Sequence, residues 1–166
     1  MIKLGEKLTF KRKWTIEKFN SQKDFEMGKS FEKNEIKHNC LLNEGINELF
    51  TILCSAASGT KFDNTNAYLG VGDEGTTPAA PAQTGLLAAT NKFYKAMDLT
   101  YPTYGTAQKA TWRSTFAALE ANYAWKEFTV INGADDTHTN LNRLVSDQGT
   151  KTSGQVWQLT FEISIS

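Results

Sequence analysis

The sequence predicts a mainly β protein, an antiparallel β-sandwich of jelly-roll type with one amphipathic helix and an extended N-terminal arm. Two observations lead to this class. Segments of alternating apolar and polar residues recur along the chain, separated at short intervals by Gly, Pro, Asn and Asp. Only one segment has the apolar spacing of a helix. With 166 residues, the chain is long enough to bury a core as one domain.

Residues 7–16 form the first predicted strand. Lysines and threonines occupy one parity of this segment, and the apolar residues occupy the other, namely Leu8, Phe10, Trp14 and Ile16. Only Arg12 breaks the alternation, which indicates one buried face. Because a lysine-rich outer face is typical of an edge strand, we predict an edge strand within a basic arm over residues 1–38. A further strand is expected near residues 31–37.

The predicted helix lies near residues 43–57. Its apolar stripe recurs every three or four residues, at Leu42, Ile46, Leu49, Phe50 and Leu53. Asn43 is a suitable N-cap, and Gly59 lies beyond the end. We expect the helix to close an end or side of the sheet with this stripe buried. Both cysteines, Cys40 and Cys54, are expected to be free, buried thiols.

Strand signals continue to the last residues. They lie at residues 67–71, 93–97, 110–116, 123–130, 141–146 and 157–165. The apolar parity changes between Trp125 and Phe128, which indicates either a β-bulge near residues 126–127 or a strand buried on both faces. Residues 75–85 are a low-complexity loop. The four tryptophans all fall on predicted strands and are expected in the core; the alternative is an exposed stacking platform.

The charge is unevenly distributed. The formal net charge is zero, but residues 1–38 hold ten basic and six acidic groups, and residues 39–166 hold eight and twelve. A neutral total excludes a dedicated nucleic-acid binder, and no segment approaches the about 20 apolar residues of a membrane span. The N-terminus also lacks a signal-peptide core. The split predicts a basic arm on an acidic body, each facing different partners or neighbouring subunits; alternatively, the charges only maintain solubility.

Motifs for catalysis or metal binding are weak. Gly70-x-Gly72-x-x-Gly75 precedes a proline-containing loop that cannot open a helix, so it predicts a glycine-rich turn and no phosphate site. His38-x-Cys40 lacks the paired spacing of a zinc site. Residues 135–138 are expected to form a solvated loop.

Glu127 is the most notable carboxylate, because it lies in an aromatic-rich segment. If buried, it would have a raised pKa suited to acid–base chemistry. The preferred alternatives are exposure or a salt bridge to Lys126, Arg113 or Arg143. No G-x-S-x-G motif is present. The sequence therefore predicts no enzyme, no cofactor and no catalytic or metal-binding residues.

The order of elements over about residues 40–165 resembles a group of small virion proteins of tailed bacteriophages. The matching segments include Leu42-Asn43-Glu44-Gly45-Ile46, Asn66-Ala67-Tyr68-Leu69-Gly70-Val71-Gly72-Asp73, Thr76-Thr77-Pro78, Glu120-Ala121-Asn122-Tyr123-Ala124-Trp125, Leu141-Asn142-Arg143, Gly149-Thr150-Lys151 and Trp157-Gln158-Leu159-Thr160. The pattern is one of strands and turns, and it does not cover the basic first segment. The resemblance implies a virion building block, made in the host cytoplasm, and implies no reaction.

The leading hypothesis is a capsid decoration (cement) protein on the head exterior, in symmetric clusters such as trimers. Its partners would be the major capsid protein and further copies of itself, without direct contact to nucleic acid or membrane. The basic arm is expected to make the contact, through Lys7, Lys11, Arg12, Lys13 and Lys18. Alternatives are a tail or baseplate protein, a host-glycan-binding module acting through residues 75–85 or 135–138, and a metal-dependent hydrolase.

Overall fold

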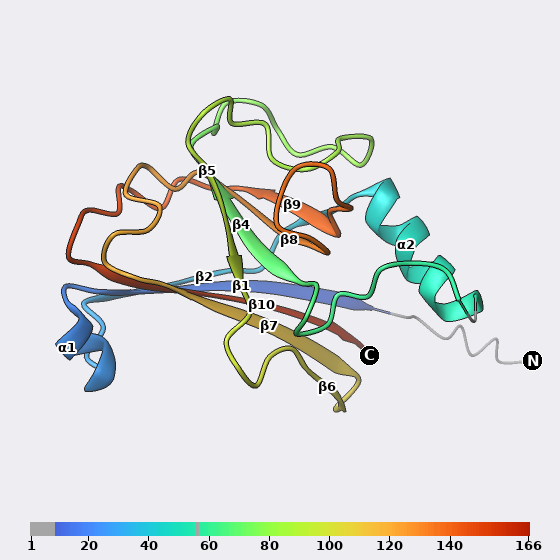
Figure 1. Ribbon diagram of the computed structural model, residues 1–166, viewed down its shortest axis with the longest axis horizontal. Coiled ribbons are helices and arrows are strands. Elements are labelled where there is room, and N and C mark those ends of the chain that lie inside the picture. Colours follow the sequence, from blue (N-terminus) through green and yellow to red (C-terminus); the bar gives the residue numbers. More distant parts are fainter. Residues whose placement is uncertain (1–8, 56) are drawn as a thin grey trace, which may run out of the picture.

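The computed structural model describes residues 9–55 and 57–166 (Figure 1). Two five-stranded antiparallel sheets face each other, which confirms the predicted β-sandwich. The first sheet has the order β2 (Glu32–Ile36), β1 (Phe10–Phe19), β10 (Val156–Ile165), β7 (Lys109–Phe116) and β6 (Thr103–Thr106). The second sheet has the order β3 (Cys40–Leu41), β9 (Asn142–Val145), β8 (Glu127–Ile131), β4 (Tyr68–Gly72) and β5 (Lys92–Ala96).

The strand β1 lies inside the first sheet, so the predicted edge strand was wrong. It pairs with β10 along its whole length and with β2 over its second half. Trp14 lies opposite Phe161, and Ile16 lies opposite Leu159, so apolar side chains of both strands face the core together. A lysine-rich outer face shows that one face of a strand is exposed to solvent, and this holds for an interior strand as well as for an edge strand. The described part of the predicted arm therefore belongs to the sandwich, and residue 38 only marks the crossing to the second sheet.

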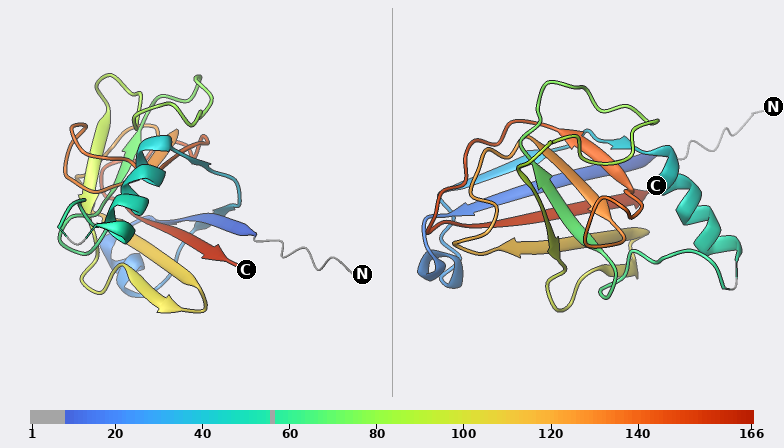
Figure 2. Two further views of the ribbon diagram at one scale, coloured as in Figure 1. Left: turned by 90° about the vertical axis from the view of Figure 1, so that its right-hand side faces the viewer. Right: turned by 45° about the horizontal axis from the view of Figure 1, so that its top comes forward.

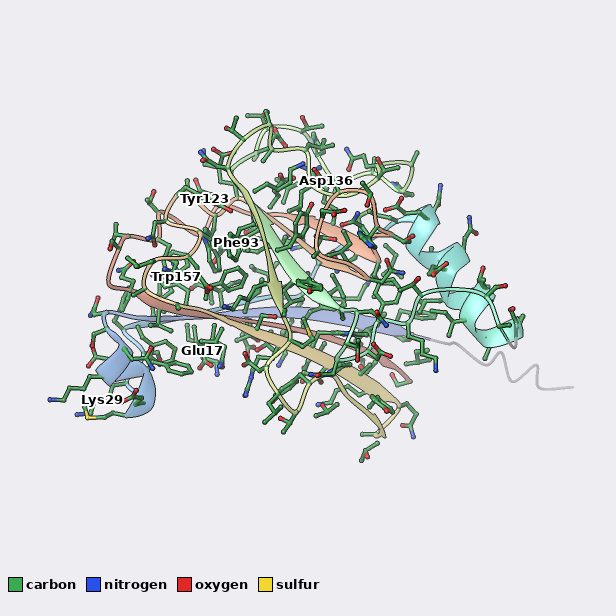
Figure 3. The ribbon with its side chains drawn as sticks, in the orientation of Figure 1. Glu17, Lys29, Phe93, Tyr123, Asp136 and Trp157 are labelled. Carbon is green, nitrogen blue, oxygen red and sulfur yellow. The ribbon has the colours of Figure 1, made fainter. Side chains whose placement is uncertain are left out.

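The core fills the space between the sheets and is rich in aromatic rings. All four tryptophans are buried, at exposed fractions of 0–6%. The ring centroids of Trp125 and Trp157 lie 4.9 Å apart, and those of Phe116 and Trp125 lie 4.7 Å apart. Figure 3 shows Trp157 between the sheets and Glu17 on the outer face of the first sheet. The prediction that the tryptophans lie in the core is confirmed.

The second sheet is buried on both faces at its centre. All five residues of β8 are buried, which confirms this alternative for the parity change after Trp125. The glycine motif lies partly in β4 and does not form the predicted turn. A Cβ atom at Gly70 would lie 2.6 Å from Cε1 of Tyr94, and one at Gly72 would meet the carboxylate of Glu127. Glycine is therefore required because side chains of neighbouring strands cross over β4.

Two helices are present among the described residues, one more than predicted. Helix α1 (Gln22–Glu26) joins β1 to β2, and the side chain of Ser21 accepts a hydrogen bond from the backbone N–H of Asp24 at 3.1 Å. The capping pattern of Ser21 and Asp24 is the sequence signal for this helix. Helix α2 (Asn43–Cys54) is the predicted amphipathic helix, with Leu42 and not Asn43 as its N-cap. Neither helix is long and apolar enough to cross a membrane.

Candidate interaction surface

Helix α2 lies across the end of the sandwich where β1 begins and β10 ends (Figure 2). The side chains of Leu49, Phe50 and Leu53 on this helix are 41%, 60% and 78% exposed. The prediction that the apolar stripe is buried was therefore wrong beyond its first turn. These three residues are called the α2 outer face below. Such clustered exposed apolar side chains are typical of an interaction site, whereas single exposed leucines are common.

The inner side of α2 is held by glycine and by carboxylates. The backbone of Gly45 lies against Leu141, and a Cβ atom there would lie 2.6 Å from the carbonyl oxygen of Asn140. Glu44 accepts a hydrogen bond from the backbone N–H of Asn140 at 2.8 Å. Glu48 accepts one from the backbone N–H of Thr60 at 2.5 Å. Because Glu44 in the first turn and Glu48 in the middle of the helix anchor the inner side, the side that carries Leu49, Phe50 and Leu53 faces outward.

The close approach at Gly45 leads to a testable prediction. We expect Gly45→Ala to lower the free energy of unfolding by about 1–3 kcal/mol, because the new methyl group meets backbone atoms that cannot rotate away. Alanine has the higher helix propensity, so an effect of this sign must arise from packing. Urea unfolding measures it, with Asn47→Ala on the exposed side of the helix as the control. Equal stability of both variants and the parent would contradict the close contact.

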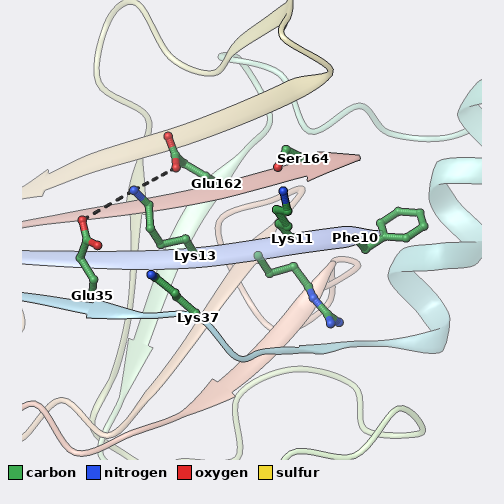
Figure 4. A pocket seen from close by; sticks show the side chains of 8 residues that line it. Phe10, Lys11, Lys13, Glu35, Lys37, Glu162 and Ser164 are labelled. Carbon is green, nitrogen blue, oxygen red and sulfur yellow. Dashed lines mark ion pairs between the residues drawn. The ribbon is translucent and has the colours of Figure 1, made fainter. Parts of the chain in front are cut away.

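The predicted contact residues divide between the two faces of β1. Lys11 and Lys13 lie on the outer face, where Lys13 pairs with Glu162 at 3.1 Å and with Glu35 at 3.6 Å (Figure 4). Arg12 has the parity of the core residues and no ion pair with any described residue. Lys7 lies outside the described residues. Lys11, Arg12 and Lys13 all belong to the half of β1 that is nearer to α2, but Arg12 lies on the opposite face of the strand from the two lysines.

Lys18 is buried and cannot make the predicted partner contact. Its side chain is 5% exposed, pairs with Glu32 at 2.9 Å and donates a hydrogen bond to the carbonyl oxygen of Gln148 at 2.6 Å. Its ammonium group also lies 4.6 Å from the ring centroid of Trp157. The parity of Lys18, shared with Trp14 and Ile16, was the sequence signal for this inward position. Lys18 therefore stabilises the fold.

Glu127 forms a buried ion pair with Arg143, one of the partners considered from the sequence. Both side chains are fully buried, and the guanidinium nitrogens Nε and Nη2 lie 2.8 and 2.7 Å from Oε2 of Glu127. The backbone N–H groups of Leu87 and Ala88 donate to the same carboxylate at 2.9 and 2.7 Å. Arg143 also pairs with Glu74 at 2.8 Å. All these contacts hold the long connection between β4 and β5 over the sheet, so Glu127 has a structural role.

Of the two loops considered for glycan binding, residues 75–85 contain no acidic group, and residues 135–138 use both of their aspartates internally. Asp135 accepts hydrogen bonds from Thr137 and contacts the ring of His138 at 3.0 Å. Asp136 pairs with Lys92 at 2.7 Å and binds the hydroxyl group of Tyr94. In residues 9–55 and 57–166, no group of three or more His, Cys, Asp or Glu side chains could hold a metal ion. Neither loop presents a free constellation of carboxylates.

Lys151 is a buried basic group with a shifted pKa. It is fully buried and donates hydrogen bonds to the carbonyl oxygen of Ala117 at 2.8 Å and to Oδ1 of Asn122 at 2.9 Å. Burial lowers its pKa from 10.5 to about 8, although Glu120 acts in the opposite direction. Between these two values the unfolded chain binds more protons than the folded chain, so stability rises with pH.

This shift predicts a pH dependence that one substitution removes. From about pH 7.5 to about pH 9.5, we expect Lys151 to add about 2 kcal/mol to the free energy of unfolding. Burial raises the pKa of Tyr94 and of Tyr123, so these groups stay protonated throughout this range in the folded protein. Urea unfolding of the parent and of Lys151→Met at several pH values measures the difference. Parallel pH profiles for the two proteins would contradict the shifted pKa.

The two cysteines are free, as expected, but not buried. Cys54 is exposed at the end of α2, and Cys40 is half-buried in β3. Cys54 follows Leu53, whose side chain is 78% exposed. It therefore provides a chemical probe beside the α2 outer face.

Comparisons with known proteins add no relative. No family model matches the chain, and no curated protein or solved structure matches it. The function proposed below therefore depends on the residues of this chain and on the resemblance to phage virion proteins.

Proposed function

We propose that this protein is a non-enzymatic structural subunit of a tailed-phage virion, a capsid decoration protein that docks on the head surface. The bare apolar face of a firmly anchored helix is the observation that carries the proposal. Leu49, Phe50 and Leu53 are presented to solvent by a helix whose inner side is tied to the sandwich through Glu44 and Glu48. Keeping such a face exposed is costly for a monomer and useful for a docking subunit.

The charges at the same end support an acidic partner surface. Lys11, Arg12 and Lys37 have no acidic partner among the described residues and lie at the end of the sandwich that carries α2. A docking surface with an apolar centre and a basic rim matches a partner with an apolar patch and acidic neighbours. The major capsid protein is the proposed partner, and the tail remains the alternative location.

Imaging a labelled copy in assembled virions tests this function. A small tag on α1 would lie at the end of the sandwich opposite α2 (Figure 1), and we expect the label to cover the head exterior. Label confined to the tail would contradict decoration and favour a tail or baseplate role. Absence of the protein from purified particles would contradict any virion role. Binding to a glycan array by the unassembled protein would favour the host-surface alternative.

A further inference from the structure

One half of β1 has a partner strand on only one side. The pairing with β10 runs from Phe10 to Phe19, whereas the pairing with β2 ends where Trp14 lies opposite Ile36. Beyond Ile36 the chain leaves β1, as the close view in Figure 4 shows near Lys37. Residues 10–13 therefore form a short open edge within an otherwise paired strand.

The backbone of this edge directs hydrogen-bonding groups into the open space. Thr9 and Ser166 exchange two backbone hydrogen bonds, at 2.7 and 3.0 Å. In an antiparallel ladder such pairs alternate, so the N–H and C=O groups of Phe10 and Arg12 face away from β10. In the described part of the chain, no backbone hydrogen bond reaches these four groups from outside the strand ladder. Two donors and two acceptors are therefore available to an incoming strand.

A basic groove runs beside the open edge. A cavity of about 480 Å³ lies there, and the charged side chains that line it are Lys11, Arg12, Lys13, Lys37, Glu35 and Glu162. Lys13 is paired with both carboxylates, so the remaining three cations have no acidic partner within residues 9–55 and 57–166. The Nε atom of Arg12 is buried without a hydrogen-bond partner in the same part of the chain. The groove therefore has an excess of positive charge.

We propose that residues 10–13 accept an extended acidic segment of a neighbouring protein as an added strand. Strand addition would satisfy the free backbone groups of Phe10 and Arg12, and acidic side chains would pair with Lys11 and Lys37. A second copy of β1 does not fit, because antiparallel pairing would bring cations opposite cations. Nucleic acid does not fit either, because phosphates offer only acceptors and would leave the two carbonyl groups unpaired.

This inference rests on the proposed function in one respect, because it assumes that the acidic strand belongs to a neighbouring protein of the assembled virion. Its test uses a fluorescent peptide of about eight residues in which Glu and Val alternate. We expect this peptide to slow hydrogen exchange at the amides of Phe10 and Arg12. The double variant Lys11→Glu/Lys37→Glu should weaken binding about tenfold or more. A matched control is Lys29→Glu/Lys23→Glu, which changes the charge equally around α1, where Figure 3 places Lys29 far from the groove.

Four results would overturn the inference. The first is unchanged hydrogen exchange at the amides of Phe10 and Arg12 when the peptide is saturating, and the second is that the control variant weakens peptide binding as much as Lys11→Glu/Lys37→Glu does. The third is displacement of the peptide by single-stranded DNA of equal charge. The fourth is faster hydrogen exchange at these two amides after removal of residues 1–8. The last result would mean that the chain's own first residues occupy the edge. Leu53→Asp on α2 should leave peptide binding unchanged. If Leu53→Asp lost attachment to virions and the parent protein did not bind the peptide, docking through α2 would stand and only the added strand would be contradicted.

Discussion

Replacing Arg143 by methionine is expected to lower the free energy of unfolding by about 3–5 kcal/mol, because the change leaves the buried carboxylate of Glu127 without its cation. The same change removes the hydrogen bonds from Arg143 to the carbonyl oxygen of Thr77 at 3.0 Å and to Gln83 at 3.1 Å. The connection between β4 and β5 would then lose its central anchor. Chemical unfolding measures the loss, and hydrogen exchange should show faster opening of residues 73–90.

A second pair of variants distinguishes the ion pair from simple packing. Removing both charges with Glu127→Leu/Arg143→Met should cost less than removing Arg143 alone, since no unpaired buried charge remains. The side chains of both residues are fully buried, so solvent screening has little effect on the comparison. A double variant that loses the sum of the two single losses would contradict electrostatic coupling between Glu127 and Arg143.

Replacing Leu53 by aspartate is expected to reduce attachment to virions about tenfold or more while leaving the isolated protein as stable as the parent. The Leu53 side chain is 78% exposed, so the change should alter the free energy of unfolding by no more than about 0.5 kcal/mol. In the assembled particle, however, the new carboxylate would lose its water within an apolar contact. Quantifying bound protein per particle after reconstitution measures the effect.

The matched control for this variant is Leu119→Asp. Leu119 is 83% exposed and lies on the connection between β7 and β8, outside α2. It introduces the same charge on an equally exposed leucine, so it should leave attachment unchanged. Equal occupancy of particles by Leu53→Asp, Leu119→Asp and the parent would contradict docking through α2.

Much of the sandwich could be predicted from the sequence because strand alternation is a local property. The alternation from Trp157 to Ile165 correctly predicts the strand β10 and its buried face. The neighbours of β1 could not be predicted, because pairing with β10 joins the two ends of the chain. The same lysine pattern fits an edge strand and an interior strand whose outer face is exposed. The predicted partner-contact residues were therefore only partly correct. Lys18 was among them, although its parity, shared with Trp14 and Ile16, places it inside the fold.

The orientation of α2 was the most consequential error. The apolar stripe correctly predicted a helix, but the direction of that stripe depends on what the other side contacts. Gly45, Glu44 and Glu48 are held by backbone groups near residues 60 and 140, and no local pattern reports such distant contacts. An amphipathic helix can bury its apolar face only against a neighbouring element of the same chain or of another. The bare α2 outer face is therefore the main addition from the structure.

Alkylation of Cys54 tests the central claim, docking through the α2 end, most directly. Cys54 is exposed at the end of α2, and Cys40→Ser would leave it as the single thiol of the chain. We expect a maleimide reagent to modify Cys54 rapidly in the free protein and much more slowly in assembled virions. A cysteine introduced at Leu119, with both natural cysteines replaced by serine, should react equally in both states. Rapid modification of Cys54 in particles at full occupancy would contradict the proposed docking.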